Sequence, residues 1–127
     1  MPRATVNVQE AERIELKTLP EGFVVIHRLS YGQKLERRAM SSQASAEMNG
    51  NGRKNMKLMV DMMNERATLF DFTHCILDHN LEDENGNKLD MTNPVHVRML
   101  DPRVAEEIER ALDKLNNFEE EDEELGN

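Results

Sequence analysis

The chain has 127 residues, a formal net charge of −9, 38% apolar residues and only 4% aromatic residues. This length suits one domain with a modest core, and the acidic balance argues against wholesale nucleic-acid binding, which needs a basic surface. No apolar run approaches the ~20 residues that span a bilayer, the single Cys excludes an internal disulfide, and no signal-peptide pattern opens the sequence. We therefore expect a cytoplasmic protein.

Charge is distributed unevenly along the chain. Basic residues outnumber acidic residues in 1–60, whereas acidic residues dominate 61–127. This asymmetry favours solubility and a basic partner.

Residues 12–30 have the pattern of an antiparallel β-hairpin. The first half alternates apolar and charged side chains, and the second half is rich in β-branched residues. Between them, Pro20-Glu21-Gly22 supplies turn chemistry, because Pro presets φ and Gly permits a positive φ. A lone hairpin is marginally stable in water, so its apolar face is expected to pack on a helix or on another chain.

A short helix is expected over residues 31–45. Ser30 and Gln33 have the spacing of a capping box, in which each side chain bonds the backbone amide of the other residue. The basic residues on one face of this helix are Lys34, Arg37 and Arg38. They are interpreted either as a solvated face or as a docking patch for an acidic partner.

Residues 55–79 lie within the longest stretch of the chain without Gly or Pro, and we expect them to be the core helix. Apolar residues recur at three- and four-residue steps on more than one side, which is typical of a buried helix. The first half is rich in methionine, a flexible side chain that serves both as core filler and on adaptable binding surfaces. The methionines expected to bind a partner are Met56, Met59, Met62 and Met63. They follow a small, polar segment, residues 41–54, that is expected to be a hinge.

A closing helix pair is expected within residues 94–118. Asn93-Pro94 and Asp101-Pro102 each combine an N-cap residue with Pro at the first helical position. The second helix has the cleanest amphipathic pattern and is expected to pack against the core helix. Its apolar face consists of Val104, Ile108, Ala111, Leu112, Leu115 and Phe118.

These elements predict an α+β fold that is mostly α, with an N-terminal β-hairpin followed by a small bundle of about four helices. Residues 1–118 are expected to form a single domain. Residues 119–127 are an acidic tail that is expected to remain disordered, because consecutive carboxylates repel one another.

The turn around Gly86 does not have the spacing of an EF-hand calcium loop. Gly at the sixth position of such a loop places the first ligand five residues earlier and a Glu six residues later. Those positions hold Leu81 and Thr92, so calcium binding is not expected.

A zinc site on the core helix is also not expected. Cys75 and His79 would share one helix face, and His74 and Asp78 an adjacent one, but a structural zinc ion needs four converging ligands. A buried thiol beside surface histidines is the expected arrangement.

Catalytic and nucleotide-binding patterns are missing from the sequence. Cys75 with His79, or a Ser with His27, lacks triad spacing, and a Cys inside a helix lacks thiolate activation. Residues 49–54 combine glycines with basic residues, but no strand leads into them and no phosphate-loop motif is present. We expect no catalytic residue, cofactor or metal.

Three phrases of the chain together resemble the tail assembly chaperones of long-tailed, siphovirus-type bacteriophages. They are residues 19–38, 74–93 and 94–116. In that family a phrase of the form "dwnL-D-dG-plp" follows a central helix, and a Leu-Asp-Pro helix start comes next. The corresponding residues here are Asp78-His79-Asn80-Leu81, Asp83 to Gly86, and Leu100-Asp101-Pro102. The resemblance covers about residues 12–120.

The resemblance implies a protein that is not an enzyme. Such chaperones bind and solubilise the tape measure protein, help recruit tail tube subunits in the host cytoplasm, and are absent from the mature virion. Many also exist in a longer, frameshifted form, and copies arrayed along one client gain avidity. No site residue is carried over, because the family has no catalytic motif.

Two other functions remain open beside the one that the resemblance implies. One is a structural phage protein, such as a head–tail connector or tail completion protein. The other is a small acidic regulator that binds a basic host protein.

Overall fold

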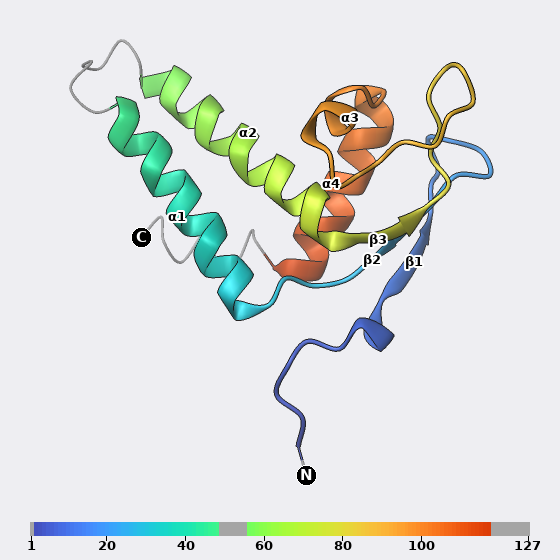
Figure 1. Ribbon diagram of the computed structural model, residues 1–127, viewed down its shortest axis with the longest axis horizontal. Helices are drawn as coiled ribbons and strands as arrows, with labels where there is room; N and C mark the ends of the chain where they lie inside the picture. The colour runs from blue at the N-terminus through green and yellow to red at the C-terminus, as the bar shows by residue number, and fades with distance from the viewer. Residues whose placement is uncertain (1, 49–55, 118–127) are drawn as a thin grey trace.

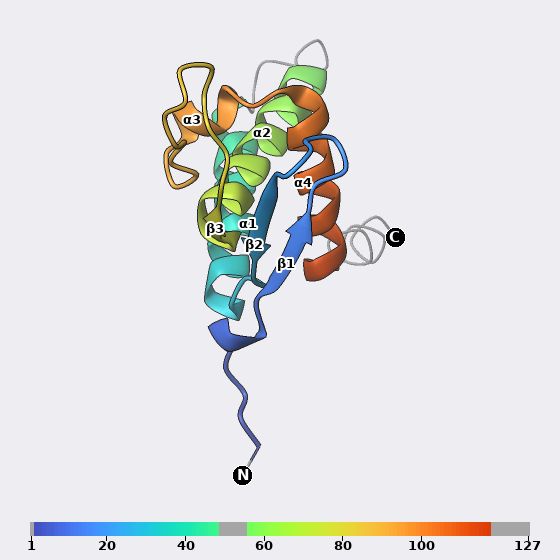
Figure 2. The same ribbon diagram turned by 90° about the vertical axis from the view of Figure 1, so that its right-hand side faces the viewer.

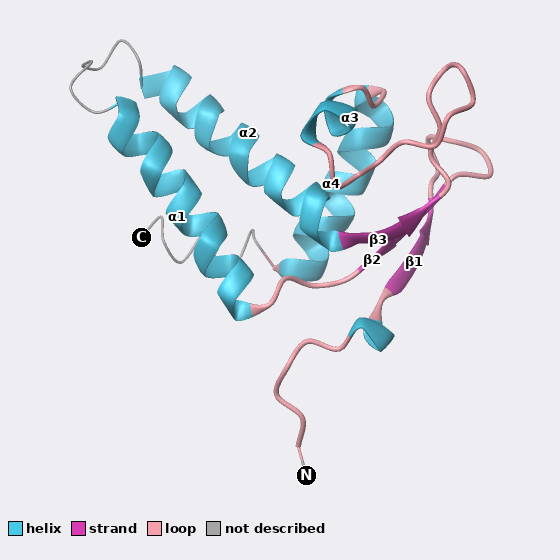
Figure 3. Ribbon diagram, in the orientation of Figure 1, coloured by secondary structure: helices cyan, strands magenta, loops and turns pink. Residues whose placement is uncertain are grey.

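The structure is a computed structural model that describes residues 2–48 and 56–117. In chain order its elements are η1 Val8–Glu10, β1 Glu12–Glu15, β2 Phe23–Ile26, α1 Tyr31–Met48, α2 Met56–Cys75, β3 Ile76–His79, α3 Pro94–Arg98 and α4 Pro102–Asn116. The expected α+β, mostly helical class is confirmed (Figure 1; Figure 3). The expected tail at 119–127 and Phe118 lie outside the described residues.

The sheet has three antiparallel strands in the order β1-β2-β3, and its third strand was not predicted. The helix expected over 55–79 ends at Cys75, and residues 76–79 pair with β2 instead. The hairpin leaves one edge of β2 with unpaired backbone groups, which a further strand satisfies. In addition, the Asn80 Oδ1 accepts a hydrogen bond of 2.8 Å from the Phe23 amide. The free edge of β2 therefore overrides the local helix preference.

The turn between β1 and β2 uses its residues differently from the expectation. The positive φ, 67°, belongs to Glu21 rather than to Gly22. Gly22 instead permits a close approach of the backbone, because a Cβ there would lie 3.0 Å from the Leu19 carbonyl oxygen. The Gly22 amide donates to the Leu19 carbonyl oxygen at 2.9 Å, which closes the turn.

The helix starts follow the expected capping chemistry. The Ser30 hydroxyl accepts from the Gln33 amide at 3.2 Å, and the Gln33 side chain accepts from the Ser30 amide at 3.0 Å. The Asn93 side chain accepts from the Val95 amide at the start of α3, and the Asp101 side chain accepts from the Arg103 amide at the start of α4. However, α1 continues through Met48, so residues 41–48 of the expected hinge are helical, in keeping with the helix preference of their Ala and Glu residues. The rest of that hinge lies outside the described residues.

The hydrophobic core lies between three parts of the fold, namely the sheet, helix α4 and the last turns of α2. Val104, Ile108 and Leu112 are buried, which confirms the expected apolar face of α4. Figure 2 shows α4 alongside the β1–β2 hairpin, and α4 also contacts α2, as expected. The hairpin thus obtains the apolar cover that it needs for stability.

Candidate functional site

The α1–α2 helical hairpin extends away from the sheet as an arm (Figure 1). The described residues of α2 that are buried lie toward its C-terminal end, from Ala67 to Cys75. Nearer its N-terminal end, Leu58 is 52% exposed and Val60 is 47% exposed. On α1, Leu35 is 48% exposed. The arm therefore presents apolar side chains to solvent, and these side chains are not covered by the main core.

The methionines expected to bind a partner belong to this arm. Met59, Met62 and Met63 are half-buried, and the side chain of Met56 lies outside the described residues. We define the arm surface by its exposed and half-buried apolar residues. These are Leu35, Leu58, Met59, Val60, Met62 and Met63. The sequence pattern did not predict a binding role for Leu58, because Leu58 lies outside the main apolar stripe of α2. An apolar residue off that stripe is nevertheless a signal that the helix has a second apolar face.

The basic residues of α1 make contacts within the protein. The Arg37 Nε donates to Asp71 Oδ1 of α2 at 2.9 Å, and the Lys34 Nζ donates to the Asn116 carbonyl oxygen at 3.2 Å. Arg38 is exposed and also interacts within the chain. Arg37 and Lys34 therefore attach the base of the arm to the body, a role that the charge pattern alone did not indicate.

Asp71 is buried beside Arg37, with 4% of its surface exposed. Burial raises the pKa of Asp71 from 3.8 to about 6, and the Arg37 guanidinium offsets only part of this effect. The ionised form of Asp71 is stabilised by Arg37, because an unpaired buried charge is strongly unfavourable.

Asn116 connects three parts of the fold, a role that the sequence did not predict. Its Oδ1 accepts from the Leu29 amide at 2.9 Å, and its Nδ2 donates to the Leu112 carbonyl oxygen at 2.9 Å. The same Nδ2 lies 3.9 Å from the Cys75 Sγ. The available signal was a polar residue four positions after Leu112, on the apolar face of α4.

The potential metal ligands at residues 74–79 do not converge on one point. Because α2 ends at Cys75, His79 does not share a helix face with it, contrary to the expectation. His74 stacks on Phe70 at 3.9 Å, and the His79 Nδ1 accepts from the Leu81 amide. Within residues 2–48 and 56–117, no group of three or more His, Cys, Asp or Glu side chains has a metal-binding arrangement.

Cys75 is fully buried. Burial raises the pKa of its thiol to about 12, with a smaller contribution from the nearby Asp71 carboxylate. The side chain therefore stays protonated at neutral pH, and a thiol is a poor nucleophile.

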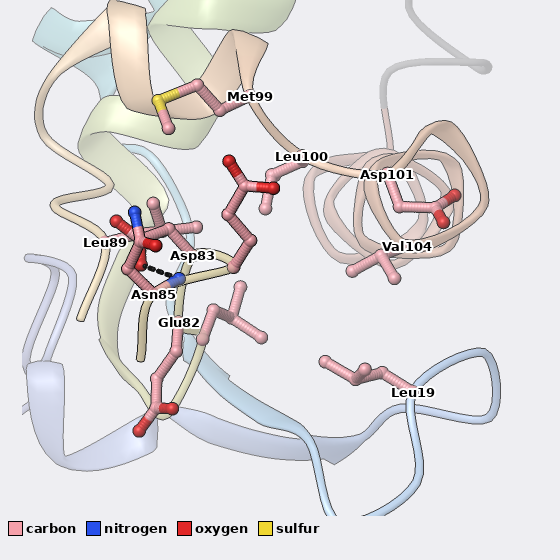
Figure 4. Close-up of a pocket in the computed structure, with 11 residues that line it drawn as sticks. Leu19, Glu82, Asp83, Asn85, Leu89, Met99, Leu100, Asp101 and Val104 are labelled. Atoms are coloured by element: carbon pink, nitrogen blue, oxygen red, sulfur yellow. Dashed lines mark hydrogen bonds between the residues drawn. The ribbon is translucent and has the colours of Figure 1, made fainter. Parts of the chain in front are cut away.

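A second surface feature is a pocket of about 460 Å³ between three loops. Leu19 from the β1–β2 turn and Val104 from α4 point into it, as does Leu89 from the segment after β3 (Figure 4). Its rim is acidic. The carboxylates are those of Glu82, Asp83, Glu84 and Asp101.

The acidic loop at this rim is held by its own hydrogen bonds. Asp83 Oδ1 accepts from the amides of Asn85 and Asn87, both at 2.9 Å. These bonds, with the Asn87 amide first, hold the pKa of Asp83 below its ordinary value. Gly86 has the expected positive φ, 81°. The loop is thus a turn with a structural role for Asp83.

Comparisons with protein-family models, curated proteins and solved structures find no match to this chain. Within the part of the chain that the structure describes, none of the helices combines the length and apolar character required to cross a bilayer.

Proposed function

We propose that this protein is a phage tail assembly chaperone that binds the tape measure protein, keeps it soluble and helps recruit tail tube subunits. It acts in the host cytoplasm, without catalysis, and leaves the tail before the virion is complete. The resemblance of residues 12–120 to that family suggests this role, and the arm surface is the observation that supports it.

The arm surface suits a client that is a long amphipathic helix. Leu58 and Val60 lie exposed beside half-buried Met59 and Met63. Methionine adapts its shape to different apolar partners. The apolar face of an amphipathic helix commonly docks on an apolar surface of this kind. Several copies along one client would add avidity, so the bound form is proposed to be an oligomeric array.

Co-expression with the tape measure protein tests the proposal. The wild-type chain is expected to keep this client in the soluble fraction and to co-purify with it. Replacing Leu58 and Val60 together by Gln is expected to weaken binding about thirtyfold, since each loses about 1 kcal/mol of apolar burial and the pair about 2 kcal/mol. Both side chains are exposed, so the fold is expected to persist.

Leu77→Gln is the matched control, because Leu77 is 46% exposed but lies on β3, away from the arm. It is expected to bind the client like the wild type. A wild-type chain that fails to solubilise the client and is found in purified virions contradicts the chaperone function and favours a structural phage protein. Binding to a basic host protein instead favours the regulator.

A further inference from the structure

We propose that the pocket beneath the loop at residues 82–85 binds a basic peptide segment of a partner protein, with an apolar side chain of that segment inserted between Leu19 and Met99. This site is separate from the arm surface and does not depend on the proposed function.

The interior of the pocket is apolar. Leu81, Leu89 and Val104 form buried parts of its wall, with at most 6% of their surfaces exposed. Leu19 and Met99 lie on opposite sides (Figure 4) and remain 37% and 57% exposed. A volume of about 460 Å³ lies in the range of ~300–1,000 Å³ typical of ligand sites. An inserted leucine- or methionine-sized side chain would remove both exposed groups from water.

The charge of the rim selects the flanking residues of the occupant. Four carboxylates line the pocket, and no Lys or Arg is among its described lining residues. Arg103 pairs with Asp101 at 3.0 Å and offsets one of these charges. Hydrogen bonds, from Asn87 to Asp83 and from Arg103 to Asp101, lower the pKa of both aspartates, so both are ionised at neutral pH.

Glu82 and Glu84 are the two lining carboxylates that are available to a partner. Both are exposed, and within the described residues neither side-chain carboxylate forms a hydrogen bond or an ion pair. By contrast, Asp83 and Asp101 already serve the turn and the helix cap. Lysine or arginine on either side of the inserted residue would complement these two glutamates.

Titration of the full-length protein with three hexapeptides, followed by backbone amide chemical shifts, tests the proposal. The first has two central leucines flanked by lysine pairs. The second replaces the leucines by serine, and the third replaces the lysines by glutamate. Only the first is expected to bind with saturable shifts at pocket residues such as Leu19, Asn85 and Leu100. Its affinity is expected to fall with added salt.

Variants then locate the site. Glu82→Lys with Glu84→Lys is expected to weaken binding of the leucine–lysine peptide about tenfold, and Met99→Ser is expected to weaken it several-fold. The matched control is Glu106→Lys, since Glu106 is exposed on α4 but does not line the pocket. It is expected to bind like the wild type, and amide spectra check that each variant is folded.

Three results would overturn the proposal. Equal binding of the serine peptide would mean that charge alone attracts the peptide, as any acidic segment would. Shifts confined to the arm surface would place the site elsewhere. Unchanged affinity in the glutamate double variant would remove the rim from recognition.

Discussion

The burial of one carboxyl group, that of Asp71, makes part of this protein's stability depend on pH. Asp71 on α2 accepts a hydrogen bond from Arg37 on α1, yet burial still raises the pKa of Asp71 to about 6. In the unfolded chain the same carboxyl has its ordinary pKa of 3.8. Between these values the folded state binds more protons than the unfolded state, so the free energy of unfolding falls as pH rises.

Asp71→Asn is expected to remove this pH dependence. Asn resembles the protonated carboxyl, so its contribution does not change as pH rises through 6. The unfolding free energy of the variant minus that of the wild type should increase by about 2 kcal/mol between pH 4 and pH 8. Urea unfolding at a series of pH values measures this difference.

Asp78→Asn is the control, because Asp78 is exposed and hydrogen bonds, chiefly from the His79 amide, lower its pKa. A lowered pKa stabilises the wild type only as pH rises through the acid range below about 4. The difference between Asp78→Asn and the wild type should therefore be nearly flat from pH 4 to pH 8, and it should slope in the opposite direction only below pH 4. A flat difference for Asp71→Asn would show that the pKa of Asp71 is not raised in the folded state.

At the scale of elements, one glutamate attaches the β1–β2 hairpin to α4. The Glu107 carboxylate accepts hydrogen bonds from the amides of Lys17 and Thr18 at 2.8 and 2.9 Å, and from the Thr18 hydroxyl at 2.6 Å. Burial works to raise the pKa of Glu107, but these bonds hold it below its ordinary value. An early glutamate on α4 suggested only a favourable interaction with the helix dipole.

Glu107→Ala is expected to destabilise the protein by about 1–3 kcal/mol, because the hydrogen bonds involve a charged acceptor. Thermal or urea unfolding measures the change. Its neighbour Glu106 is exposed on the same helix, and Glu106→Ala should stay within about 0.5 kcal/mol of the wild type. Equal effects of the two substitutions would mean that helix propensity, not the contact with the β1–β2 turn, determines the loss.

At the scale of the whole molecule, the arm and the body differ in how much apolar surface they bury. The body contains the core of the sheet, α4 and the last turns of α2, whereas Leu58 and Val60 in the arm remain exposed. Segments with few buried contacts open at lower free energy than the core. Such a segment can adapt to a client while the body stays folded.

Hydrogen exchange should therefore divide α2 into two parts. Amides from Phe70 to Cys75 are expected to be protected to nearly the global unfolding free energy, and those from Leu58 to Met63 much less. Exchange followed by mass spectrometry or amide spectra measures this gradient. Uniform protection along α2 would contradict a separately opening arm. Added tape measure protein should raise protection in the arm first.

Much of the fold was predictable because its signals are local. The capping box at Ser30 and Gln33, the capped starts of α3 and α4, and the period of Val104, Ile108 and Leu112 each lie within a few residues. The candidate site was predictable only in part. Methionines pointed to the arm, but nothing local distinguished half-buried Met59 from exposed Leu58, since exposure depends on which helix lies opposite.

The sequence by itself therefore determined the hairpin, the helix starts and the amphipathic face of α4, because backbone capping and side-chain periodicity act over short separations. The tertiary structure alone decided that residues 76–79 leave the helix, since the open edge of β2 offers backbone partners that a lone segment lacks. It also decided the use of Arg37 and Glu107, whose partners are distant in the chain.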